Sequence, residues 1–189
     1  MELQRRRAVA WAIALAHEPS LTPHAYEREC LERYVSGEVT LRELLIHLDT
    51  RIQQVLYRSQ AAPNLTQADI ARLLQQARAH NTQHDITGLL CFSEGHFIQL
   101  LEGPAPAVLE LYARIQQDPR HQAVKTLRDS AGPLRWFAEW QMAYAQIPPG
   151  EYYWLLSHLD SPHRLLPVEK IAILDPHLQT LLHAFSQLT

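Results

Sequence analysis

The chain has 189 residues, of which 47% are hydrophobic and 20% are charged, with a formal charge of −3 and a pI near 6.4. This size allows one large domain, or one ordinary domain with an appendage. The balance of charge gives no sign of a nucleic-acid partner, which usually requires a basic face. No apolar run reaches the length of a transmembrane helix, so we expect no membrane partner.

Histidines, cysteines and the N-terminus give little indication of special chemistry. The 11 histidines are scattered without HExxH spacing, so we expect no metal site. Cys30 and Cys91 lie far apart and form no disulfide framework, which favours a reducing compartment. Arg5-Arg6-Arg7 and the Ala-rich stretch 8–16 resemble a short signal peptide. That stretch is only modestly hydrophobic and continues into a helical pattern, so we expect a cytoplasmic protein.

Residues 1–51 are expected to form a module of three short helices. The first spans about Leu3–His17, and the second begins after Thr22-Pro23 and ends at Gly37. A capping box at Thr40–Glu43 starts the third helix. Three such helices bury little area, so the module would depend on a neighbour or a partner.

Residues 52–147 have the pattern of a second domain with the order βαββαββ. The expected elements are a strand at 53–60, a helix capped by Thr66, a hairpin with strands at 86–92 and 97–101, a helix from Pro106, and strands near 123–128 and 140–146. Two crossovers and a hairpin predict an α+β, ferredoxin-like sheet with both helices on one face and one extra strand. We expect the first and third strands to be adjacent, parallel and central.

Residues 148–189 are expected to form a C-terminal helical extension. Two amphipathic helices are predicted, at Tyr152–Leu159 and about Pro176–Leu188. They are too short to be a domain. We expect them to cover the other face of the sheet or to form a dimer contact there, so a homo-oligomer is predicted.

Gln99 is a polar residue in an apolar strand. It lies between Phe97 and Leu101, where alternation places another apolar side chain on the same face. Leaving a buried amide unpaired costs about 1–3 kcal/mol, so protein groups or a polar ligand must satisfy it. In the expected sheet Tyr57 is its neighbour on the helix-facing side. The pair is either a satisfied buried polar pair or the floor of a ligand site.

Several segments of the second domain, in order, resemble the BLUF domains, which are blue-light sensors using FAD. The segments are VLYRSQA, RAHN with its GLL continuation, FIQLLEG, DPRH and FAEWQM, and they cover about Gln53–Ile147. The resemblance implies non-covalent binding of FAD, with FMN or riboflavin as alternatives. It also implies that Tyr57 is the photoactive tyrosine and Gln99 the switching glutamine.

Further roles follow from the same resemblance. Asn81 would bond the carbonyl edge of the flavin, and Trp140 and Met142 would be the tryptophan and methionine of the last strand that accompany signalling. The remaining residues expected near the ligand are Ser59, His80, Arg120 and His121. Each residue also has a structural interpretation: Tyr57 as a sheet tyrosine, Asn81 as a helix terminator, Trp140 as core, and Arg120 and His121 as solvated residues.

The first 50 residues resemble the small helical antitoxins of Fic-type adenylyltransferase toxins, the VbhA-like group. The segment LERYVSGEVTLRELLIHLD carries this resemblance, which implies a Fic-type toxin as partner and Glu18 as the glutamate that enters the toxin. Ala14 and Pro19 depart from the inhibitory motif. The sequence therefore leaves open whether the module still inhibits a toxin or now serves dimerisation or output coupling.

Our leading hypothesis is a photoreceptor that signals from Gln99 to a helical output module by protein contacts. An antitoxin-like binding module, with the BLUF-like part as light gate or scaffold, is the alternative. An enzyme on the same scaffold is the weakest hypothesis. An acylphosphatase-like site would need arginine and glycine in the loop 60–66, which has neither.

Overall fold

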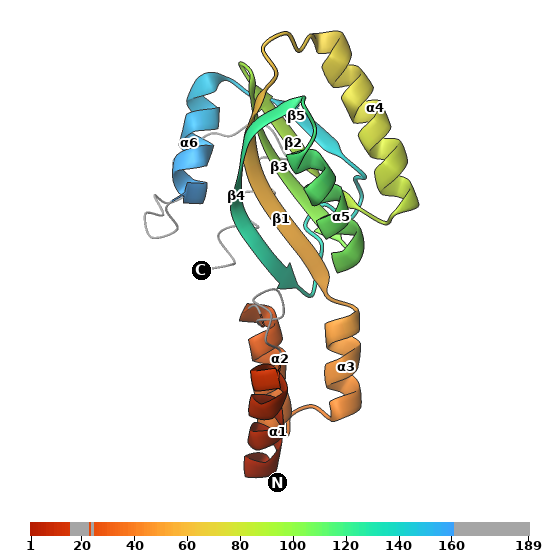
Figure 1. The fold of residues 1–189 in the computed structure, drawn as a ribbon, viewed down its shortest axis with the longest axis vertical. Coiled ribbons are helices and arrows are strands. Elements are labelled where there is room, and N and C mark those ends of the chain that lie inside the picture. Colours follow the sequence, from red (N-terminus) through yellow and green to blue (C-terminus); the bar gives the residue numbers. More distant parts are fainter. Residues whose placement is uncertain (16–22, 24, 161–189) are drawn as a thin grey trace.

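A computed structural model describes residues 1–15, 23 and 25–160 of the chain (Figure 1). An N-terminal helical module contains α1 (Glu2–Leu15), α2 (Ala25–Ser36) and α3 (Leu41–Asp49). The elements that follow are β1 (Ile52–Ala61), α4 (Gln67–Gln83), β2 (Thr87–Ser93), β3 (His96–Gly103), α5 (Ala105–Gln116), β4 (His121–Gly132), β5 (Ala143–Gln146) and α6 (Pro149–Asp160). The predicted βαββαββ order is therefore confirmed.

The five strands form one sheet in the order β4-β1-β3-β2-β5. Strand β1 is antiparallel to both β4 and β3, β2 is antiparallel to β3, and β5 joins β2 in parallel. The first and third strands are adjacent and central, as predicted, but the prediction that they run parallel was wrong. The α4 crossover brings β2 back parallel to β1, and the following hairpin reverses the chain, so β3 must run against both.

Three residues with positive φ angles shape the β2–β3 hairpin. Its two turn residues, Glu94 and Gly95, have φ angles of 41° and 79°, which suit the right-handed twist of the strands. In β2, Gly88 has a φ of 154°, and a Cβ there would lie 2.0 Å from the Leu100 carbonyl oxygen. Only glycine allows the two strands to approach this closely.

Each face of the sheet is covered by different helices. Leu73 of α4 and Val108 of α5 pack into the apolar core on one face, while Tyr152 and Leu155 of α6 pack on the other (Figure 1). The first C-terminal helix thus covers the opposite face, one of the two positions predicted for it. The second predicted helix, at 176–188, lies outside the described residues.

The helical module extends beyond one end of the sheet and has a small core of its own (Figure 1). Cys30, Val39 and Leu44 are buried together in it. The predicted capping box is present, because Thr40 Oγ1 accepts from the Glu43 backbone N–H and Glu43 accepts from the Thr40 N–H at 2.7 Å. Glu18 lies outside the described residues. Within the described ranges, no helix has the length and apolarity needed to cross a bilayer.

Candidate functional site

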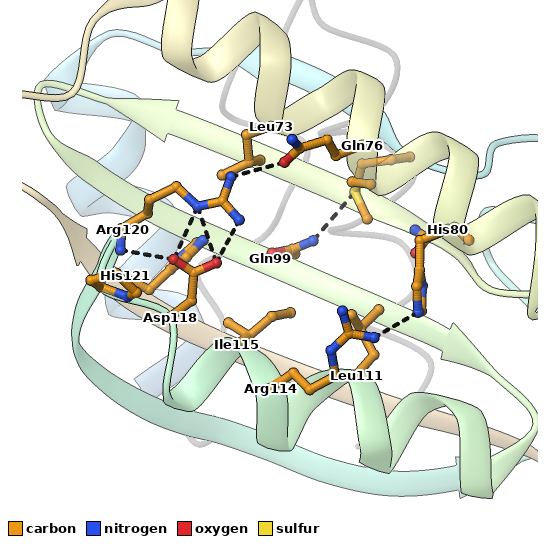
Figure 2. A pocket seen from close by; sticks show the side chains of 14 residues that line it. Leu73, Gln76, His80, Gln99, Leu111, Arg114, Ile115, Asp118, Arg120 and His121 are labelled. Atoms are coloured by element: carbon orange, nitrogen blue, oxygen red, sulfur yellow. Dashed lines mark hydrogen bonds and ion pairs between the residues drawn. The ribbon is translucent and has the colours of Figure 1, made fainter.

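A cavity of about 550 Å³ lies between α4 and α5 on the sheet (Figure 2). It is lined by Leu73, Gln76, Ala77, His80, Asn81, Gln99, Leu111, Arg114, Ile115, Asp118, Pro119, Arg120, His121 and Met142. The lining combines apolar side chains with a few polar groups that project from different elements. This arrangement is typical of a site for a planar organic cofactor with a polar edge.

Gln99 forms part of the floor of this cavity and has partners at both ends of its amide. Its Nε2 lies 3.5 Å from the Met142 sulfur (Figure 2). Its Oε1 accepts a hydrogen bond from the Tyr57 hydroxyl. Tyr57 and Gln99 are directly opposite each other in the β1–β3 register, which is why the two side chains meet. Among the described residues, these two contacts use only part of the hydrogen-bonding capacity of the amide.

Tyr57 is completely buried behind Gln99. Burial raises the pKa of its phenol well above the ordinary value, with smaller contributions from Tyr112 and Asp118. The ring of Tyr112 lies 5.2 Å from that of Tyr57, centroid to centroid. Tyr57 is therefore a neutral hydroxyl donor at physiological pH, and its proton is directed at Gln99.

Asn81 lies in the last turn of α4 and is 1% exposed. Its Nδ2 donates to the Gln141 carbonyl oxygen at 2.6 Å, whereas its Oδ1 is buried without a hydrogen-bond partner among the described residues. An orphaned buried acceptor costs about 1–3 kcal/mol. Because Asn81 lines the cavity, an N–H group of a ligand could satisfy this oxygen.

One end of the cavity is closed by Arg120, which is already engaged by protein groups. Its guanidinium pairs with the Asp118 carboxylate at 2.6 Å and donates to Gln76 of α4 at 3.1 Å (Figure 2). The hydrogen bond from Arg120 lowers the pKa of Asp118. Arg120 is therefore a cation compensated by Asp118, and its side chain remains 39% exposed.

The next residue, His121, is buried in the same region beside Ser59. Its Nδ1 lies 2.9 Å from the Ser59 hydroxyl, and its ring lies 4.9 Å from that of Phe97. Burial lowers the pKa of His121 to about 4, so the imidazole is neutral at pH 7. A neutral imidazole offers one donor and one acceptor, and one of these already faces Ser59.

His80 and Arg114 meet across the opposite end of the cavity. The guanidinium of Arg114 on α5 lies 3.2 Å from His80 Nε2 on α4 (Figure 2). The His80 ring also stacks on His84 at 4.1 Å. Burial is the main cause that lowers the pKa of His80. Both ends of the cavity are thus spanned by polar contacts from α4 to the α5 side.

Trp140 and Met142 differ in their relation to the cavity. Met142 is buried and contacts Gln99, whereas Trp140 is 38% exposed and does not line the cavity. The predicted strand at 140–146 begins three residues later, at Ala143. Two side chains of α4 donate hydrogen bonds to the backbone carbonyl oxygens just before this strand. Asn81 donates to the Gln141 oxygen, and Arg78 donates to the Met142 oxygen at 3.1 Å.

Three polar lining residues were missed as site residues: Gln76, Arg114 and Asp118. Asp118 belongs to the DPRH segment that carries the resemblance, so that segment could have identified it. Gln76 and Arg114 each lie beside the apolar stripe of a helix that faces the cavity. Polar residues at the border of an apolar stripe are common on solvated helices, so the sequence gives no specific signal for them.

Comparison with known families places this cavity in a known class of domain. The family model described as sensors of blue-light using FAD (BLUF) matches residues 52–143. Residues 52–143 form a BLUF domain. The BLUF domain contains β1 to β4, α4 and α5, and it ends at the first residue of β5.

Two proteins whose names describe control by light are similar to just under half of this chain. Over 93 residues it is 40% identical to photoactivated adenylate cyclase subunit beta of Euglena gracilis, covering 47% of this chain and 11% of that protein. Over 85 residues it is 38% identical to the blue light- and temperature-regulated antirepressor BluF of Escherichia coli (strain K12), covering 45% of this chain and 21% of that protein. The chain therefore spans only a minor part of these two relatives.

Solved structures support the fold of the BLUF domain. The dark-state structure of the BLUF protein BlrB matches with a TM-score of 0.53 and 28% identity, covering 72% of this chain and 98% of that chain. The ground state of BlsA matches with a TM-score of 0.54 and 25% identity, covering 71% of this chain and 87% of that chain. The BLUF domain is a blue-light sensor module with a ferredoxin-like fold.

Proposed function

We propose that this chain is a blue-light photoreceptor that binds a flavin non-covalently between α4 and α5 and uses Tyr57 and Gln99 as its photoswitch. One observation carries the proposal: the buried Tyr57–Gln99 hydrogen bond lies at the floor of a cavity lined by Asn81, whose Oδ1 is unpaired among the described residues. FAD is the expected flavin, and FMN or riboflavin would use the same ring-binding groups.

Each end of the cavity has a separate role in the proposed binding. Asn81 would accept an N–H from the polar edge of the flavin ring, while its Nδ2 stays on Gln141. Arg120, His121 and Ser59 would lie toward the ribityl-phosphate tail, and His80 would border the ring from α4. Apolar side chains from both helices would exclude water from the faces of the ring.

Switching would follow from the donor and acceptor pattern of Gln99. A photoexcited flavin supplies a strong oxidant, and a neutral phenol is among the side chains that can be oxidised. Tyr57 would lose an electron and its phenolic proton and then recover both, so no net redox change remains. Gln99 would be left rotated or tautomerised, with a new hydrogen bond to the flavin and a changed contact to Met142.

Output is proposed to occur through protein contacts of the helices outside the BLUF domain. Light can shift the arrangement of such helices only by the free-energy difference that the new hydrogen-bond state imposes on them. Met142 is the direct protein contact of the Gln99 amide nitrogen, and it leads through β5 to α6. We also propose a homo-oligomer, in which the copies contact each other through the surfaces of these helices.

An absorption spectrum before and after blue light tests this proposal. Flavin-loaded protein is expected to shift reversibly to the red, and Tyr57→Phe and Gln99→Leu are expected to bind flavin without that shift. Tyr153→Phe is the matched control, because Tyr153 is 59% exposed and lies on α6. A colourless protein that refuses flavin contradicts the proposal, and a normal photocycle in either switch variant contradicts the assigned roles.

Residues 1–51 are proposed, as the second candidate function, to bind a Fic-type toxin. The observation that favours it is that the segment carrying the resemblance folds as the second half of α2 and all of α3, joined by a turn that ends in the Thr40–Glu43 capping box. A pull-down with a Fic-type adenylyltransferase in darkness and in light tests it. Glu18→Ala is expected to weaken capture, and failure of the unaltered chain to bind in both conditions would contradict it.

A further inference from the structure

Glu102 is a carboxylate buried at 0% exposure in the central strand β3. It follows Gln99 by three residues, so it faces the opposite side of the sheet from the switch. Its neighbours on that side, Ile98 and Leu100, belong to the core that α6 covers. Because a buried carboxylate is costly without strong partners, its contacts indicate what it does.

The partners of Glu102 are mainly backbone amides of the loop between β4 and β5. The Trp136 N–H donates to Oε1 at 2.9 Å and the Phe137 N–H donates to Oε2 at 2.9 Å. The amide nitrogen of Gln54 on β1 donates to Oε1 at 3.0 Å. Hydrogen bonds to a charged acceptor are stronger than neutral ones, so the carboxylate anchors the middle of this loop.

This loop connects the two faces of the sheet. Phe137, in its middle, is completely buried in the core beneath α6, whereas Met142, at its end, is buried beneath α4 and α5 against Gln99. The end of the loop is held by Asn81 and by the Gly88 N–H, which donates to the Trp140 carbonyl oxygen at 3.0 Å. The position of Met142 is therefore set by anchors in the middle and at the end of the loop.

We propose that Glu102 is a positioning residue of the photoswitch. Its carboxylate fixes the Trp136–Phe137 segment, and thereby it holds Met142 in place against Gln99 and ties the switch to the core under α6. This proposal rests on the proposed function, because the switch that Glu102 positions is the flavin-linked one.

Glutamine cannot replace Glu102 without loss. Its amide nitrogen would face either the Phe137 N–H or the Gln54 donor, so two donors would oppose each other. Gln54 cannot turn its amide over to compensate, because its Nε2 also donates to the Leu134 carbonyl oxygen at 3.2 Å. The variant Glu102→Gln thus removes charge and one hydrogen bond while it nearly preserves the volume of the side chain.

The test compares full-length Glu102→Gln with Glu139→Gln, which removes an exposed carboxylate from the same loop. Hydrogen exchange of the Trp136 and Phe137 amides is measured in darkness, and the return of the red-shifted flavin spectrum is timed after blue light. Glu102→Gln should increase both the amide exchange rate and the dark recovery rate by roughly tenfold, because a hydrogen bond to a charged group is lost. Glu139→Gln should match the unaltered chain in both.

Unchanged amide exchange and unchanged recovery in folded Glu102→Gln would overturn the proposal. Faster exchange with unchanged recovery would also overturn it, because Glu102 would then stabilise the loop without positioning the switch. If Glu102→Gln does not fold, Gln54→Met removes one donor from the same carboxylate and should give smaller changes in the same direction. Absence of a light-induced shift in the unaltered chain contradicts the proposed function, which is distinguishable from these outcomes.

Discussion

Acidification should destabilise the flavin-free protein through His121. This imidazole is 7% exposed, and burial lowers its pKa to about 4 in the folded chain. In the unfolded chain the pKa of histidine is about 6.5. Between these values the unfolded chain binds a proton that the folded chain does not, so the free energy of unfolding falls as the pH falls.

The size of this effect follows from the difference between the two pKa values. One pKa unit corresponds to about 1.4 kcal/mol, so the full loss is about 3 kcal/mol once the pH has reached about 4. At pH 5 about 2 kcal/mol of it has already been lost relative to pH 7. The stabilising contribution of His121 is fully present above the pKa of histidine in the unfolded chain, which is about 6.5. It is lost as the pH falls from about 6.5 to about 4.

Urea unfolding of the flavin-free chain at pH 7 and pH 5, at constant ionic strength, measures the loss. His121→Gln cannot titrate in this range, so the difference in unfolding free energy between the two pH values should shrink by about 2 kcal/mol in this variant. His96→Gln is the matched control, because the His96 ring contacts the Glu94 carbonyl oxygen at the hairpin turn and not Ser59. It should retain the pH dependence of the unaltered chain.

The reasoning is refuted if His121→Gln loses as much stability between pH 7 and pH 5 as the unaltered chain does. In that case His121 would be protonated in the folded state with little penalty, and its burial beside Ser59 and Phe97 would not control its charge. The neutral imidazole assigned to the tail end of the cavity would then be wrong as well.

Three further substitutions test other parts of the structure. Asn81→Ala should weaken flavin binding by roughly tenfold or more in a fluorescence titration, because the ring edge and Gln141 both lose a partner; unchanged affinity would refute its role. Gly88→Ala should lower the free energy of unfolding by about 3 kcal/mol, because a Cβ would lie 2.0 Å from the Leu100 carbonyl oxygen. A Cβ at Gly150 would meet no neighbouring atom within 4 Å, so Gly150→Ala should change the free energy of unfolding by less than about 1 kcal/mol. Equal effects of the two substitutions would contradict the close approach of the strands at Gly88. Thr40→Ala should lower the free energy of unfolding of the helical module by about 1 kcal/mol, measured by thermal unfolding. Thr50→Ala, at the other end of α3, should lower it by less. A larger effect of Thr50→Ala would argue against the capping box.

Local patterns were enough to predict most elements of this chain. The capping box at Thr40, the apolar stripes of α4 and α5, and the alternation along β3 all depend on residues two to four positions apart. Alternation also placed Tyr57 and Gln99 on the helix-facing side of adjacent strands, where the β1–β3 register pairs them. The segments that resemble BLUF domains matched the family found by comparison.

The sequence by itself therefore determined the order of the elements, the polar pair at the centre of the sheet and the class of domain. Only the tertiary structure decided the antiparallel direction of β1 and β3 and the burial of Glu102 under the β4–β5 loop. It likewise decided that Met142 contacts Gln99 and lines the cavity, whereas Trp140 does not line it. These features depend on contacts between residues more than 30 positions apart, and no local periodicity encodes which backbone amide or sulfur atom will meet a given side chain.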